Sequence, residues 1–306
     1  GKHILKDYGV RPLEKVFYNI HIEGLDRATN LGVSDTLLNV TFDITPPVLT
    51  ISSPISDSPV NSSQLTLNFS EPLKKGRVTW VATAGPDPNS PHVRNFSEQD
   101  RQQGDKIDFI FESPPSLVDG VEYQVVVEGT DLAGNKGEPF KVNNVFYDIT
   151  PPRFTDVEPL DSTFINEAYI NYTLSENLME GKIYFENVGG SSDPKTTHMI
   201  TLAGNKKNKG NQGGKLPPSF IRLVNGSIYN IRFEGVDAAG NSAPEVVIKN
   251  IVFDNEIPVL AVSKPTNNSF INSPQISFSI SEDLVKSSLV LEHIAGTTDP
   301  SSPHVI

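Results

Sequence analysis

The chain has 306 residues, no cysteine and a formal net charge of −12 at pH 7. The lack of cysteine excludes disulfides, thiolate nucleophiles and cysteine-based zinc sites, and scattered acids without a basic face argue against nucleic-acid binding. No apolar run approaches the roughly 20 residues of a membrane span, so we expect no membrane insertion in this segment.

A unit of about 105 residues repeats along the chain, and three short sequence elements mark it. In chain order these are a loop of the form E-G-x-D-x-x-x-N, a proline-containing linker with an aspartate, and the sequence Ser-Glu-x-Leu. The spacing is 17 residues from loop aspartate to linker aspartate and 28 from there to the glutamate, in every copy. The recurring acids are Asp26, Asp131 and Asp237 in the loop, Asp43, Asp148 and Asp254 in the linker, and Glu71, Glu176 and Glu282 after it.

The repeat divides the chain into four parts. Residues 1–42 match the C-terminal half of a unit, residues 43–147 and 148–253 are full units, and residues 254–306 match the N-terminal half. We expect the missing halves to belong to the same polypeptide, outside this segment. The alternative is head-to-tail pairing of the two halves between neighbouring copies. That pairing would bury Ile271, Ile276, Phe278 and Leu289 against Phe17, Ile20 and Ile22.

The third part shows the strand pattern most clearly. Residues 168–174 alternate apolar and polar side chains, residues 182–188 form a second apolar run, and residues 228–235 and 245–253 flank a turn. No helical period of adequate length appears, and the loop at residues 204–215 is expected to be a solvated hairpin. About seven short strands in a unit of this length are typical of an immunoglobulin-like sandwich. The sequence therefore predicts an all-β fold of tandem immunoglobulin-like β-sandwiches joined end to end.

Two further details favour this fold. Residues 117–123 and 223–229 both read L-x-x-G-x-x-Y, which is typical of the tyrosine corner of these sandwiches. A large apolar residue follows nine positions after each recurring glutamate, where the third strand is expected to enter the core. These residues are Trp80, Phe185 and Leu291.

The pattern Y-x₅-G-x-D-x-A-G-N, followed by a strand and D-x-T-P-P, resembles the bacterial Ig-like and fibronectin type III-like tandem repeats of large extracellular adhesin or filament proteins. The resemblance covers the whole chain. It implies an extracellular or cell-surface location, a structural or adhesive role, and neighbouring Ig-like repeats as partners, with surface glycans or proteins as further candidates. No nucleophile or zinc-protease signature is present, so we expect no enzyme. The alternative is a set of spacer or glycan-binding modules attached to a secreted hydrolase.

The recurring acids are expected to meet at one end of each sandwich, because the N-terminus, the B–C loop and the F–G loop share a pole in this fold. Three carboxylates and an amide oxygen form a hard-oxygen site suited to calcium, which would stiffen the linker. The resemblance points the same way, and plain turn chemistry is the alternative. The predicted sets are Asp43, Glu71, Asp131 and Asn135; Asp148, Glu176, Asp237 and Asn241; and the incomplete pairs Asp26 with Asn30 and Asp254 with Glu282.

A second motif, D-P-x-x-x-H, also recurs. It pairs Asp87 with His92, Asp193 with His198 and Asp299 with His304. Aspartate and histidine can ligate a metal, but a proline-containing turn that leads into a strand explains the motif equally well.

Overall fold

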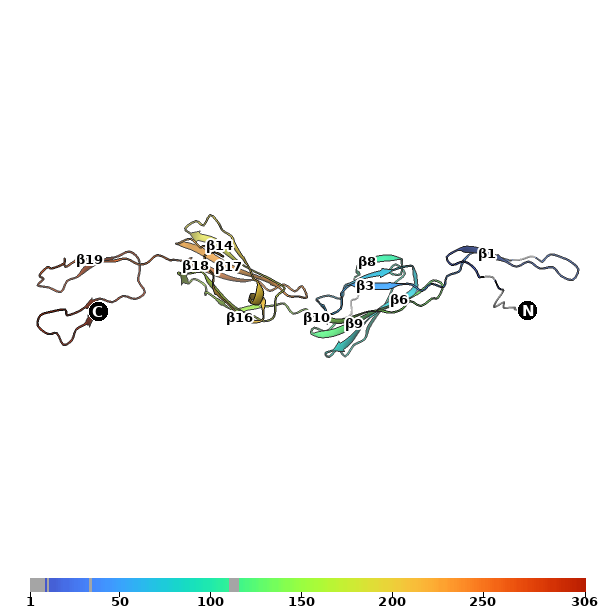
Figure 1. Ribbon diagram of the computed structural model, residues 1–306, viewed down its shortest axis with the longest axis horizontal. Coiled ribbons are helices and arrows are strands. Elements are labelled where there is room, and N and C mark those ends of the chain that lie inside the picture. Colours follow the sequence, from blue (N-terminus) through green and yellow to red (C-terminus); the bar gives the residue numbers. More distant parts are fainter. Residues whose placement is uncertain (1–8, 10, 33–34, 110–115) are drawn as a thin grey trace.

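The computed structural model describes residues 9, 11–32, 35–109 and 116–306. Its regular structure is almost entirely β, as predicted, and a single 3₁₀ turn, η1 (Gly204–Lys207), is the helical element of the described part. The described residues contain no helix that is both long and apolar enough to span a membrane. Figure 1 shows the repeats following one another in a row, with the two described ends of the chain far apart.

The first complete sandwich consists of a three-stranded and a five-stranded sheet. The smaller sheet has the order β3 (Leu49–Ser53), β5 (Leu65–Phe69), β8 (Gly104–Phe109). The larger has the order β4 (Pro59–Val60), β10 (Phe140–Tyr147), β9 (Val121–Asp131), β6 (Leu73–Ala84), β7 (His92–Asn95). Every pair is antiparallel except β4 with β10, which is parallel. In immunoglobulin lettering these sheets are A-B-E and A′-G-F-C-C′.

Strict alternation of side chains along β9 builds one wall of this core. Val121, Tyr123, Val125 and Val127 are all fully buried, and the residues between them are half-buried. Period-two alternation sends these four side chains to the same face of the sheet. Trp80 of β6 packs edge-on against Tyr123, with the ring centroids 5.9 Å apart. The predicted burial of Trp80 is therefore confirmed.

The second complete sandwich repeats this arrangement with its own separate core. Its smaller sheet has the order β11 (Phe154–Glu158), β13 (Tyr169–Leu174), β16 (Gly210–Lys215). Its larger sheet has the order β12 (Phe164–Ile165), β18 (Val246–Phe253), β17 (Ser227–Val236), β14 (Glu180–Gly190), β15 (His198–Thr201). Phe185 is fully buried in its core, as predicted. The buried residues of the two cores form two distinct clusters, one between positions 49 and 145 and the other between 154 and 253.

The tyrosine corner is present in both sandwiches. The hydroxyl oxygen of Tyr123 accepts the backbone N–H of Val118 at 2.9 Å, and that of Tyr229 accepts the N–H of Val224 at 3.0 Å. Each tyrosine thereby fixes the turn that leads into its own strand.

The expectation that residues 204–215 form a solvated hairpin is wrong. The segment forms η1 and then β16, whose six residues pair in antiparallel register with β13. This strand could not be recognised from its sequence, because it contains Gly210, Gly213 and Gly214 and therefore has no alternation of apolar and polar side chains. It pairs with β13 through its backbone. All three glycines have positive φ, which other residues adopt only at a cost.

The half-units at either end form isolated hairpins with exposed apolar side chains. The strands are β1 (Phe17–His21) with β2 (Thr36–Thr41), β19 (Leu260–Lys264) with β20 (Ser277–Ile280), and β21 (Val290–Leu291) with β22 (His304–Val305). Phe17 is 71% exposed. Leu291 is 42% exposed, whereas its counterparts in the complete sandwiches, Trp80 and Phe185, are buried. Leu291 is thus not buried as expected, because the half-unit lacks the strands that would cover it.

Candidate metal centre

The aspartate of each F–G loop is held by the loop's own backbone. Asp131 Oδ1 accepts the N–H of Gly134 at 2.7 Å and the N–H of Asn135 at 2.8 Å. In the second sandwich Asp237 Oδ1 accepts the N–H of Asn241 at 2.8 Å. Both aspartates are buried, at 0% and 3% exposure. This part of the motif is therefore turn chemistry, whatever else the carboxylates do.

The loop asparagine ties the F–G loop to the linker through its amide nitrogen. Asn135 Nδ2 donates to the backbone oxygen of Asp43 at 3.0 Å and to Asp131 Oδ2 at 2.8 Å. Asn241 Nδ2 makes the same two bonds, to the backbone oxygen of Asp148 at 2.9 Å and to Asp237 Oδ2 at 2.8 Å. These bonds use the amide nitrogen of each asparagine, whereas the predicted calcium ligand is its amide oxygen.

Three carboxylates gather at this pole in each complete sandwich. Asp43, Glu71 and Asp131 form one group, and each offers an oxygen that lies within 4.8 Å of the oxygens offered by the other two. Asp148, Glu176 and Asp237 form the other group within the same limit. The linker, the B–C turn and the end of the F strand supply one residue each. The structure thus brings together the three carboxylates of each predicted set.

The spacing of these oxygens fits a single calcium ion. Calcium binds oxygens at about 2.3–2.6 Å, so two oxygens on one ion are at most about 5 Å apart. The 4.8 Å limit lies inside that range. Carboxylates bind either through one or two oxygens, so three of them supply between three and six of the 6–8 ligands that calcium takes.

The carboxylates of each group disfavour one another's charge. Burial raises the pKa of the Glu71 carboxyl, and the neighbouring Asp43 charge raises it further. Burial and the Asp148 charge likewise raise the pKa of Glu176. The charges of Lys15 and Lys209 offset part of the rise in the pKa of Glu71 and Glu176, but among the described residues no lysine or arginine forms an ion pair with either group. A divalent cation is a charge that would relieve the remaining repulsion.

The pKa values of Asp148, a linker aspartate in one group, and Asp131, a loop aspartate in the other, are shifted in opposite directions. Burial raises the pKa of Asp148, and the nearby Asp237 charge adds to the effect. Burial alone would also raise the pKa of Asp131, but the hydrogen bonds from Asn135 and Gly134 outweigh it and hold that pKa below its usual value. Asp131 is therefore stably ionised, while Asp148 and the two glutamates bear the repulsion.

Asp119 lies at the junction between the two complete sandwiches, the second junction of the chain. It was not among the site residues predicted from sequence. It belongs to the E–F turn of the first sandwich, and its carboxylate accepts the N–H of Ile149 at 2.7 Å and the hydroxyl of Thr150 at 2.6 Å. These hydrogen bonds lower the pKa of Asp119. Its charge in turn contributes to the raised pKa values of Asp148 and Glu176. Asp119 thus attaches the linker to the preceding sandwich beside the acidic group.

The incomplete poles contain only parts of the site. Asp26 Oδ1 accepts the N–H groups of Ala28 and Asn30 at 2.8 and 2.9 Å, so the loop conformation forms even in the half-unit. Asp254 Oδ1 accepts the N–H of Glu256 at 3.1 Å. The other linker aspartates, Asp43 and Asp148, likewise accept the N–H of the residue two positions later. Glu282 lies with Asp254 in the C-terminal half-unit, and Figure 1 places that half-unit at the opposite end of the row from Asp26 and Asn30.

The D-P-x-x-x-H motif forms a buried network at a different place. Asp87 Oδ2 lies 2.6 Å from His92 Nε2 and accepts the hydroxyl of Tyr123 at 2.7 Å. Asp193, His198 and Tyr229 repeat these contacts at 2.6 and 2.7 Å. Oδ1 of Asp87 accepts the N–H of Asn89 at 3.0 Å, so both carboxylate oxygens have protein partners. The motif therefore links the C–C′ turn to the tyrosine corner.

No protein-family model matches the chain, and no curated protein matches it either. Among solved structures, the FN1–FN3 domains of chicken CNTN1 share 13% identity, cover 78% of this chain and 77% of that chain, and give a TM-score of 0.39. The fibronectin(III)-like modules of Clostridium thermocellum CbhA share 13% identity, cover 68% of this chain and 94% of that chain, and give a TM-score of 0.31. The fold assignment rests on the strand order and the tyrosine corners described above.

Proposed function

We propose that the chain is a non-catalytic part of an extracellular or cell-surface stalk or filament, in which tandem sandwiches act as spacers and calcium stiffens each junction. The observation that carries this proposal is the group of three carboxylates at the head of each complete sandwich. One of the three, Asp43 or Asp148, belongs to the linker itself. A cation held there would fix the path of the linker against the B–C and F–G loops.

Two further contacts support stiffening at the second junction. Asn241 ties the backbone of Asp148 to the sandwich that follows, and Asp119 ties Ile149 and Thr150 to the sandwich that precedes. Consecutive linker residues are therefore bound to different sandwiches. Calcium bound at Asp148 would reduce the remaining freedom between them, and proline at the next two positions already restricts the backbone.

The partners we propose are neighbouring immunoglobulin-like repeats, in cis or head to tail between copies. The support comes from the apolar side chains that the half-units expose, among them Ile20 in β1 and Phe278 in β20. The counterparts of these two strands in the complete sandwiches are β9 and β5, which bury their apolar side chains in a common core. An adhesive role towards surface glycans or proteins is part of the proposal and follows from the sequence resemblance.

Calorimetry of the whole chain with calcium and with excess chelator tests the metal. A ligand at 100 times its Kd stabilises the folded state by about 2.7 kcal/mol, which raises the melting temperature of a domain of this size by roughly 10–20 °C. We expect an increase of this order for both complete sandwiches. Glu245→Gln is the control variant, since Glu245 is exposed and lies outside the acidic group of the second sandwich. It should show the same increase in melting temperature with calcium as the wild type. An unchanged melting temperature at millimolar calcium would contradict the proposal.

Small-angle X-ray scattering distinguishes calcium binding alone from calcium binding that also stiffens the junctions. Calcium that binds and stiffens the junctions narrows the distribution of end-to-end distances as well as raising the melting temperature. Calcium that raises the melting temperature without changing the scattering binds within a sandwich and does not stiffen the junction.

A further inference from the structure

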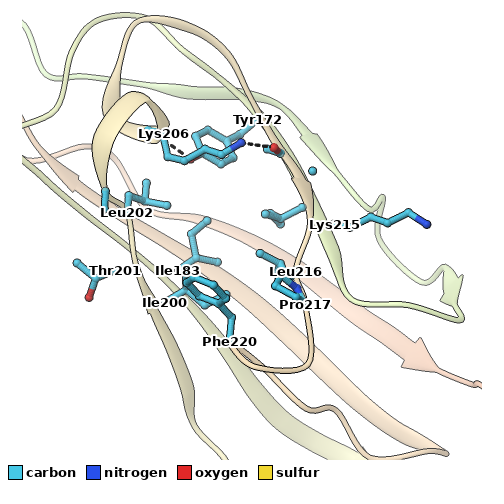
Figure 2. A pocket seen from close by; sticks show the side chains of 14 residues that line it. Tyr172, Ile183, Ile200, Thr201, Leu202, Lys206, Lys215, Leu216, Pro217 and Phe220 are labelled. Atoms are coloured by element: carbon cyan, nitrogen blue, oxygen red, sulfur yellow. Dashed lines mark hydrogen bonds between the residues drawn. The ribbon is translucent and has the colours of Figure 1, made fainter.

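The second sandwich contains an apolar cavity of about 280 Å³ at its open edge. The cavity lies between the two sheets, with β15 on one side and β16 on the other, and η1 borders it (Figure 2). Ile170, Ile183 and Ile200 line its inner part. Phe220 also lines it but is 69% exposed, so this ring lies between the cavity and solvent.

The first sandwich fills the corresponding space with aromatic rings. The N–H of Phe96 donates to the backbone oxygen of Gly76, and the N–H of Leu202 makes the same bond to Gly181, so Phe96 and Leu202 occupy equivalent positions. The Phe96 ring packs against Phe69 and Phe109, with centroids 5.3 and 5.9 Å away.

Phe109 also has a smaller counterpart in the second sandwich. Phe109 pairs with Leu65, and Gly214 pairs with Ile170, at equivalent points of the two smaller sheets. The second sandwich therefore has leucine and glycine where the first has two phenylalanines. Both smaller residues line the cavity. Among the described residues, the space that Leu202 and Gly214 leave open in the second sandwich is thus occupied by two aromatic rings in the first.

The walls of the cavity are preformed. The Tyr172 hydroxyl donates to the backbone oxygen of Lys206 at 2.8 Å, which fixes η1 over the cavity (Figure 2). Lys206 Nζ donates across to the backbone oxygen of Gly213 in β16. These two bonds join η1 to the smaller sheet on both sides of the opening, so a ligand would meet a shaped site, which lowers the entropic cost of binding.

The cavity also has a positive charge that no acid in the described residues neutralises. Lys206 lines it and forms no ion pair among those residues, although the chain as a whole is acidic. Lys215, by contrast, pairs with Glu167 at 2.7 Å. An ammonium has three donors, and the bond to Gly213 uses one. Two donors of Lys206 are available to an anion next to an apolar surface.

We infer that this cavity is a binding site for a small aromatic carboxylate, whose rings lie against the three isoleucines and whose carboxylate meets Lys206. A dry cavity of about 150 Å³ holds benzene, so 280 Å³ accommodates two fused rings. The isoleucines supply the apolar contact and Lys206 supplies the preference for an anion. Among the described residues of the first sandwich, Phe96 and Phe109 occupy the places of Leu202 and Gly214.

Methyl NMR of the whole chain with 2-naphthoate tests the site. We expect saturable shifts of the Ile170, Ile183 and Ile200 methyl groups, with a Kd on the order of 0.1–1 mM for a ligand of this size. The methyl groups of Ile51, in the first core, stay unchanged. Absence of saturable shifts at the three cavity isoleucines up to several millimolar overturns the proposal. Shifts confined to the exposed isoleucines of the half-units overturn it as well.

Two variants and a second probe test the chemistry. Leu202→Phe restores the ring found in the first sandwich and weakens naphthoate binding at least about tenfold, whereas Phe96→Leu, its counterpart, leaves the affinity unchanged. Lys206→Met weakens naphthoate binding about tenfold, the loss of one charge-assisted hydrogen bond. The same variant strengthens the weaker binding of 2-naphthylmethylamine, because the Lys206 charge no longer repels its ammonium. Equal affinity of wild type and a folded Leu202→Phe variant overturns the location. Equal affinity for the amine and the acid overturns the role of Lys206.

Discussion

Asn241 donates a side-chain hydrogen to the backbone oxygen of Asp148, across 93 positions of sequence. Its amide nitrogen also donates to Asp237 at 2.8 Å, so both amide hydrogens are used inside the protein. A single side chain thereby sets the distance between the linker and the F–G loop. The carboxylates of Asp148 and Asp237 are close together because this amide holds their backbones in place.

Asn241→Ala is expected to destabilise the second sandwich by about 1–3 kcal/mol, because it removes the side-chain donor to the partly buried carbonyl of Asp148 and to Oδ2 of the buried Asp237 carboxylate. Chemical denaturation followed by methyl NMR of Ile231 and Ile248, both in the second core, measures the change. Asn30→Ala is the matched control, since Asn30 occupies the same loop in an exposed half-unit. A denaturation midpoint equal to that of the wild type would show that the amide bonds carry no net stability.

Glu176→Gln is expected to change stability with opposite signs in the two metal states. Without calcium the substitution removes a charge that its neighbours disfavour, so the second sandwich melts at a higher temperature than the wild type. With calcium it removes a ligand, so the same variant melts at a lower temperature. Differential scanning calorimetry in chelator and in calcium checks both signs. A change of the same sign in both conditions refutes the shared cation.

Acid is expected to destabilise the second sandwich through Asp193. Burial would raise the pKa of this carboxyl, but the hydrogen bonds from His198 and Tyr229 hold it below its ordinary value. Its stabilising contribution is therefore complete above the ordinary carboxyl pKa and is lost as the pH falls through the lower folded value. The stability difference between wild type and Asp193→Asn should shrink over this acid range. Denaturation at a series of pH values between about 5 and 2 measures it.

Alkali is expected to destabilise the first sandwich through Tyr123. Burial raises the pKa of this phenol to about 12, and the hydrogen bond to Asp87 adds to the rise. The unfolded chain ionises its tyrosines near pH 10, so the folded state holds the extra proton and stability falls as the pH rises from about 10 to about 12. Trp80 is the only tryptophan of the chain and lies in this core, so its fluorescence reports this sandwich alone. Tyr123→Phe should show a flatter alkaline profile.

Asp119→Ala is expected to widen the range of orientations between the two complete sandwiches while leaving each folded. The substitution removes both bonds that hold Ile149 and Thr150 to the first sandwich. The chain has no cysteine, so Lys141→Cys and Lys195→Cys give a clean pair of spin-label positions on exposed residues. The distribution of distances between the two spin labels, measured by double electron–electron resonance, should be broader in the variant. An unchanged distance distribution would show that Asp119 does not restrain the junction.

The all-β fold and the positions of the acids could be predicted because the repeated units of the chain can be compared with one another. Asp43 and Asp148 begin units in which the same number of residues, 28, separates the linker aspartate from the B–C glutamate, and the alternation in β9 and β17 reveals which face is buried. β16 could not be predicted, because Gly213 and Gly214 contribute only backbone. Asp119 could not be assigned either, because its role depends on where the next sandwich lies.

The network of Asp87, His92 and Tyr123 shows a different limit of sequence reasoning. The motif and the tyrosine corner were both recognisable, but Asp87 and Tyr123 are 36 positions apart, and nothing in the spacing indicates that they meet. The contact arises because β6 and β9 are neighbours in the same sheet, which brings the turn after β6 beside the start of β9.

The parallel pairing of the short A′ strand with the last strand of each sandwich determines how the chain responds to tension. Pro59 and Val60 of β4 pair with Phe146 and Tyr147 of β10, next to where the chain leaves the first sandwich. β12 and β18 repeat this pairing in the second. A force that pulls the chain ends apart drives two parallel neighbours in opposite directions, so it loads their hydrogen bonds in shear and all together. Each sandwich is thus built to yield abruptly under load rather than to peel open strand by strand.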